Sequence, residues 1–110
     1  MYLEEDSSKF THKGYTYSVN DIIVATKDAE VEALPLTCFY WMIPLVKVNE
    51  DRLRRADVSV PVIYTIDEDF GFVVLDGAHR LIKTHLSGQT TIRCKKVSID
   101  FLQRIRGDHN

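Results

Sequence analysis

Two apolar runs separated by a short polar segment lie in the middle of the chain, a pattern typical of two strands. Residues 60–66 and 70–75 are apolar runs rich in β-branched and aromatic side chains. Asp67, Glu68 and Asp69 separate them and predict a polar turn, so we expect a β-hairpin. Metal binding by these acids is the less favoured alternative. Because 70–75 is apolar on both faces, we expect it to lie in the centre of its sheet.

The spacing changes to that of a helix at residue 78. From 78 to 86, the apolar residues Leu81, Ile82 and Leu86 fall on one face, which we expect to pack on the sheet. Ser87-Gly88 predicts the end of this helix.

Weaker patterns on either side predict the remaining elements. They are a helix capped by Ser18 and ending near residue 27, a strand over 31–36 interrupted by Pro35, a helix over 48–56 capped by Asn49, a strand over 90–97 near an edge of the sheet, and a final helix from residue 99. The whole predicts a single α/β (α+β) domain over 14–106, with a small mixed sheet of about four strands and flanking helices. Residues 1–13 are expected to form a flexible N-terminal arm and 107–110 a tail.

The segment 38–45 is dense in aromatic and apolar groups and is bounded by prolines. We expect it to supply core residues and an irregular connection. The alternative is a surface that binds a protein partner through Phe39, Tyr40 and Trp41.

Composition limits the classes of function. With 110 residues and 45% apolar content the chain supports one core, and its net charge of −2 makes DNA an unfavourable partner. The chain begins with acidic residues and has no apolar stretch near the roughly 20 residues that span a bilayer, so we expect a cytoplasmic protein without a membrane segment.

The cysteines and histidines show no metal-ligand spacing. Cys38 and Cys94 are expected to be buried thiols rather than a disulfide or zinc ligands. We therefore predict no structural metal.

The turn Asp76-Gly77-Ala78-His79-Arg80 joins the apolar strand to the helix that follows. At such a turn the first N–H groups of the helix point outward, the helix dipole adds positive charge, and arginine can bind phosphate bidentately. Lys83 lies one turn beyond His79 and extends the basic face. The sequence therefore predicts a phosphate-binding turn.

This order of strand, Asp-Gly-x-His-Arg turn, helix, Ser-Gly and strand resembles the ParB/sulfiredoxin-like superfamily, also called the ParB-like nuclease domain. Residues 60–97 carry the resemblance, which is closest to small stand-alone members of phages and bacteria. It implies that an adenine or cytosine nucleotide binds with its triphosphate over Gly77 and against Arg80, with His79 in the same phosphate-contacting box.

Ala78 separates the chain from two members of that superfamily. Sulfiredoxins carry their catalytic cysteine at this place and partitioning ParB proteins a glutamate, so a sulfiredoxin reaction is not expected. A free amino-acid kinase of ParB-like fold is similar to this chain in having an acid before the glycine, where Asp76 stands.

We accordingly expect a nucleoside triphosphate, ATP or CTP, to bind at residues 76–80 and Lys83. If the protein is an enzyme, the resemblance implies a phosphotransferase or nucleotidase that uses Mg²⁺, with Asp76 as base or metal support and His79 beside the developing charge. The alternatives are a helix cap for Asp76, a surface ion pair for Arg80, and solvated side chains for His79 and Lys83.

Three arginines, Arg52, Arg54 and Arg55, are interpreted as an exposed face of their helix, with closure over a nucleotide as the alternative. The main competing function is a non-catalytic, phage-type protein that binds a host protein or a second copy of itself through its aromatic segment. A DNA nuclease is the least favoured function, because the chain shows no clustered acids.

Overall fold

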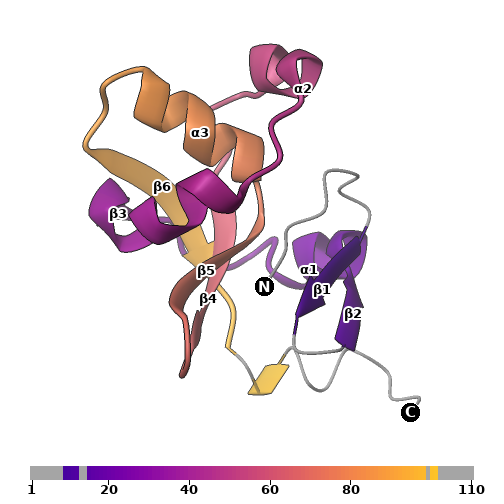
Figure 1. Cartoon of the computed structure of the whole chain (residues 1–110). Helices are drawn as coiled ribbons and strands as arrows, with labels where there is room; N and C mark the ends of the chain where they lie inside the picture. Colours follow the sequence, from indigo (N-terminus) through magenta and orange to yellow (C-terminus); the bar gives the residue numbers. More distant parts are fainter. Residues whose placement is uncertain (1–8, 13–14, 99, 102–110) are drawn as a thin grey trace.

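A four-stranded mixed sheet forms the centre of the computed structural model, which describes residues 9–12, 15–98 and 100–101 (Figure 1). The strands are β3 (Glu32–Pro35), β6 (Thr91–Lys96), β4 (Val62–Asp67) and β5 (Gly71–Asp76), in the order β3-β6-β4-β5. β4 is parallel to β6 and antiparallel to β5, and β3 is antiparallel to β6. The mixed α+β fold and the β4–β5 hairpin predicted from the sequence are confirmed.

Helices flank this sheet or pack on α3 in the described part of the chain, and a separate hairpin precedes them in sequence. The helices are α1 (Val19–Ala25), the 3₁₀ helix η1 (Leu36–Leu45), α2 (Glu50–Arg55) and α3 (Ala78–Leu86), and the hairpin consists of β1 (Lys9–His12) and β2 (Tyr15–Ser18). The predicted caps form, because Ser18 accepts a hydrogen bond from the N–H of Asp21 and Asn49 accepts one from that of Arg52. None of the helices in the described ranges combines the length and apolarity needed to cross a bilayer.

η1 and α3 lie on the same face of the sheet (Figure 1). The ring of Tyr40 on η1 meets that of His85 on α3 edge-on, with centroids 5.6 Å apart. The ring of Tyr64 on β4 packs against the rings of Phe39 and Phe72, with centroids 5.8 and 5.7 Å apart. These aromatic contacts join η1 to the middle of the sheet.

α1 covers the opposite face. Lys95 of β6 is paired with Ile63 and therefore projects from the face opposite Tyr64. Its Nζ donates to the carbonyl oxygens of Thr26 and Lys27, just after α1, at 3.2 and 3.0 Å. A cation on the last carbonyls of a helix satisfies groups that the helix itself leaves unpaired.

The predicted strand order was wrong in two places. β5 lies at an end of the sheet although Val73, Val74 and Leu75 are buried, because η1 covers its edge and the face of Val74, and α1 also packs against this strand. Trp41 Nε1 donates to the carbonyl of Phe72 at 2.8 Å, and the N–H of Val74 donates to Met42 Sδ at 3.1 Å. Side chains of η1 thus occupy backbone groups that a further strand would use.

β6, expected near an edge, lies between β3 and β4. Its polar residues Thr91 and Arg93 are exposed because the β3–β6 half of the sheet is open on that face, while Ile92 and Cys94 are buried on the other. A strand whose buried and exposed residues alternate therefore lies inside the sheet rather than at its edge.

Packing of α3 follows the prediction at its start and departs from it at its end. Leu81 and Ile82 are buried, whereas Leu86 is 67% exposed. Leu86 was wrongly assigned to the packed face: it is the last residue of α3, where the chain turns away through Ser87 and Gly88. The predicted helix end at Ser87-Gly88 is confirmed.

The ends of the predicted domain are described only in part. Residues 9–12 of the expected N-terminal arm form β1. Residues 100–101 are helical, at the place of the expected final helix. The remainder of that helix, the rest of the arm and the tail at 107–110 lie outside the described residues.

Candidate functional site

Gly77 forms the turn between β5 and α3. Its backbone has φ +105° and ψ 27°, and it is the N-cap of α3 without a side-chain cap hydrogen bond. A Cβ at this position would lie 2.8 Å from Cγ1 of the buried Val62 and 3.2 Å from Cζ of Arg80. Both the backbone angle and the space available therefore require glycine.

Arg80 is held against the start of this turn. Its Nη2 lies 2.9 Å from Oδ2 of Asp76, and its Nη1 donates to the carbonyls of Pro61 at 2.6 Å and Val60 at 3.4 Å. The Arg80 and Asp76 side chains are 19% and 13% exposed. This is a partly buried, oriented ion pair rather than a loose surface contact. The carboxylate of Asp76 pairs with Arg80, while the N-cap of α3 is Gly77.

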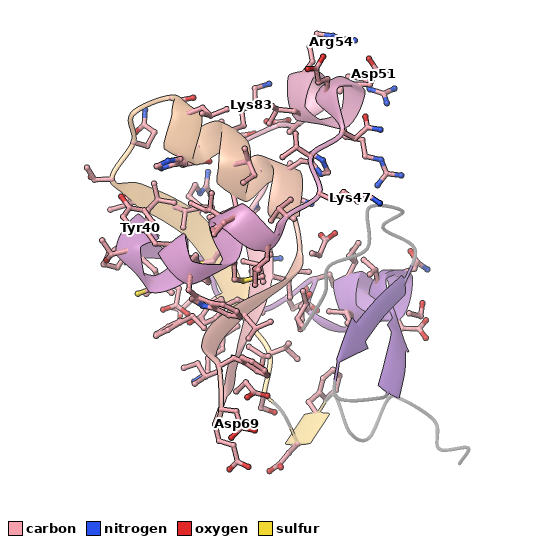
Figure 2. All side chains as sticks on the ribbon, viewed as in Figure 1. Tyr40, Lys47, Asp51, Arg54, Asp69 and Lys83 are labelled. Carbon is pink, nitrogen blue, oxygen red and sulfur yellow. The ribbon has the colours of Figure 1, made fainter. Side chains whose placement is uncertain are left out.

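His79 and Lys83 project together, as their spacing predicts, and both contact α2. Nε2 of His79 accepts a hydrogen bond from the N–H of Asn49 at 3.0 Å, which places the proton of a neutral ring on Nδ1. Nζ of Lys83 donates to the carbonyls of Arg54 and Ala56, at 2.9 Å each. Figure 2 shows Lys83 on α3 below α2. These contacts with α2 were not predicted.

Asp57 is a second carboxylate at the site, and sequence reasoning missed it. Hydrogen bonds from the hydroxyl and N–H of Ser59 hold the pKa of Asp57 below its usual value, and the positive charges of Arg80 and Lys83 lower it further. Lys83 donates a hydrogen bond to the carbonyl of Ala56, just before Asp57, and Arg80 donates one to the carbonyl of Val60. The N–H of Val60 in turn donates to the carbonyl of Asp57, so both cations contact the turn that contains Asp57. The local signal is Asp-x-Ser, a common turn motif without functional meaning by itself.

The arginines of α2 lie on its outer surface, and none of the residues of α2 is buried. Arg54 pairs with Asp51 on the same helix, at its end farthest from the sheet (Figure 2). Arg55 Nε donates to the backbone carbonyl of Asp51, and Arg52 is half-buried. Arg54 and Arg55 therefore lie on an exposed face, whereas Arg52 is partly covered.

The aromatic segment does not form one continuous surface. Phe39 is fully buried and was wrongly included in a candidate interaction surface, because its ring fills the space between η1 and the sheet. Trp41 is half-buried and stacks on Phe70, while Tyr40 is 46% exposed. The expectation that the segment supplies core residues is confirmed, but the connection is a 3₁₀ helix rather than irregular.

Asp67 forms the predicted hairpin turn. It is 3% exposed, and its Oδ1 accepts hydrogen bonds from the N–H groups of Asp69 and Phe70 at 2.7 and 3.0 Å. Across the described residues, no group of three or more His, Cys, Asp and Glu side chains is placed to hold a metal ion.

Neither described cysteine forms a disulfide. Cys94 is buried as predicted, and this burial, with the nearby charge of Glu32, raises the pKa of its thiol to about 11. Cys38 is half-buried.

Comparison with known proteins gives one similarity of fold. No family model matches the chain, and no curated protein matches its sequence. Among solved structures, a sulfiredoxin from Arabidopsis thaliana is similar, with a TM-score of 0.49 and 20% sequence identity over 68% of this chain and 94% of that chain.

Proposed function

We propose that the chain binds a nucleoside triphosphate, with the phosphates at the turn from Asp76 to Arg80. The observation that carries this proposal is the uncapped start of α3 behind a left-handed glycine that a buried neighbour holds in place. A helix start without a side-chain cap leaves backbone N–H groups for an anion, and the dipole of a helix favours negative charge there.

The charges around the turn support the same proposal. Arg80 lies within the first turn of α3, and His79 and Lys83 extend the basic face beside it. Asp76 would repel a phosphate if it stood alone, but its pairing with Arg80 offsets its charge. Guanidinium groups bind phosphate oxygens in pairs, and an oriented guanidinium loses less conformational entropy on binding.

The proposal extends to phosphoryl transfer or hydrolysis with Mg²⁺. Asp76, which pairs with Arg80, and Asp57, whose charge Arg80 stabilises, supply carboxylate oxygens, the ligands that Mg²⁺ prefers. Asp76 keeps Oδ2 on Arg80 and accepts the proton of the attacking hydroxyl or water at its other carboxylate oxygen.

Calorimetric titration with ATP, CTP, GTP and ADP in the presence of Mg²⁺ tests binding. We expect saturable binding of ATP or CTP by the wild type and its loss in Arg80→Ala. Arg93→Ala is the matched control, since it removes the same charge from an exposed position on β6. Equal loss in both variants would point to a general charge effect, and no binding by the folded wild type would refute the nucleotide site.

Release of ADP or CDP, measured in the same samples, tests the catalytic part. We expect Asp76→Asn to abolish this release while nucleotide binding persists. Unchanged turnover in that variant would refute the role of Asp76 as base.

A further inference from the structure

α2 is attached to the body of the protein by polar contacts at both of its ends. It has six residues, none of them buried, and its one apolar side chain, Leu53, is half-buried. At its start the N–H of Asn49 donates to His79, and at its end Lys83 binds the carbonyls of Arg54 and Ala56. A helix this short is not stable by itself in water, so its docking depends on these polar contacts together with the packing of Leu53 against the core.

The two side chains that fasten α2 belong to the proposed phosphate site. His79 and Lys83 lie one turn apart on α3, and each uses its functional group on α2. A bound phosphate attracts the ammonium group of Lys83 and favours the protonated form of His79. An imidazolium has no acceptor atom, so it cannot keep the hydrogen bond from Asn49.

We propose that α2 covers the basic face of α3 and that a bound polyphosphate displaces α2 from it. The anion and α2 compete for His79 and Lys83, so each binds more weakly when the other is in place. Release of α2 exposes the basic face of α3 and frees a segment that carries Arg52, Arg54 and Arg55 and no longer holds its helical form. This competition rests on the proposed function, whereas the attachment of α2 by Lys83 does not.

Hydrogen–deuterium exchange of the full chain, read by mass spectrometry over residues 49–57, tests the proposal. Without ligand, Lys83→Met should speed exchange there about tenfold, because two hydrogen bonds from a charged donor are lost. Lys83→Arg, which keeps the charge and donors, should restore most of the protection. Lys95→Met is the matched control, since Lys95 likewise donates to two carbonyls, but after α1, and should speed exchange only near residues 19–27.

The wild type is then compared with and without ATP and Mg²⁺, with calorimetry on the same samples. We expect faster exchange at 49–57 together with slower exchange at 77–80. Binding without a change at 49–57 would overturn the competition and leave the nucleotide site standing, whereas no binding would overturn both. Unchanged exchange in Lys83→Met would refute the attachment itself.

Discussion

Replacing Gly77 with alanine should destabilise the fold more than any other glycine replacement at a described position. At φ +105° an L-residue is strained by about 1–2 kcal/mol. The new Cβ would also lie 2.8 Å from Cγ1 of Val62, which is fully buried on β4 and has little room to move. Overpacking of this kind costs about 1–3 kcal/mol. The sum, about 2–5 kcal/mol, is a large part of the about 5–15 kcal/mol that stabilises a typical domain.

Urea unfolding followed by circular dichroism and by the fluorescence of Trp41, the one tryptophan of the chain, measures this loss. Gly88→Ala is the matched control, because Gly88 has φ +79° with no atom within 4 Å of the added Cβ. We expect only the backbone cost there, about 1–2 kcal/mol.

The double variant Gly77→Ala/Val62→Ala separates the two costs, because truncating Val62 removes the atom nearest to the new Cβ. We expect the double variant to lose less stability than the sum of the single variants. Equal losses in Gly77→Ala and Gly88→Ala, or strict additivity in the double variant, would show that contact with Val62 does not restrict the turn.

Further predictions concern the charge pair, the sheet edge and the buried thiol. Arg80→Met should cost about 1–3 kcal/mol in urea unfolding, because it leaves the carboxylate of Asp76 partly buried without its cation, and adding Asp76→Asn should recover part of this loss. Trp41→Phe removes the hydrogen bond to the carbonyl of Phe72 and should lower the free energy of unfolding by about 1 kcal/mol; an unchanged urea midpoint would contradict this. Burial raises the pKa of Cys94 from 9.0 to about 11, so on alkalinisation the unfolded chain releases this proton first. The free energy of unfolding should therefore fall as the pH rises through this range, and Cys94→Ala should flatten that fall.

Local signals predicted the α-helices α1, α2 and α3 and the four strands of the main sheet, because their causes lie within a few residues, but they did not predict the β1–β2 hairpin or η1. Ser18 and Asn49 cap the helices that their positions indicate, and Ser87-Gly88 ends α3. The strand order could not be predicted in this way. Val73, Val74 and Leu75 are buried by elements distant in sequence, such as η1, whose Trp41 and Met42 lie 31 and 32 positions before their partners on β5. A sequence pattern indicates that a strand is buried but does not show which element covers it.

In the candidate site, too, local features could be predicted from the sequence and tertiary contacts could not. The strand, the glycine turn and the helix could be predicted from residues 70–86 alone, and so could the shared direction of His79 and Lys83. The partner of those two side chains could not, since α2 lies about 30 positions away in sequence and reaches them only through the tertiary fold. Asp57 was missed for the same reason.

The contacts of η1 with β5 also occupy backbone groups at one edge of the sheet. An edge strand with free backbone groups is a template for pairing between chains and for aggregation. Here Trp41 and Met42 occupy such groups on β5. At the other end of the sheet β3 has four residues, including Pro35, which lacks an N–H, so it is a poor template. The aromatic segment that suggests a binding surface in the sequence therefore protects the folded chain against strand-to-strand self-association.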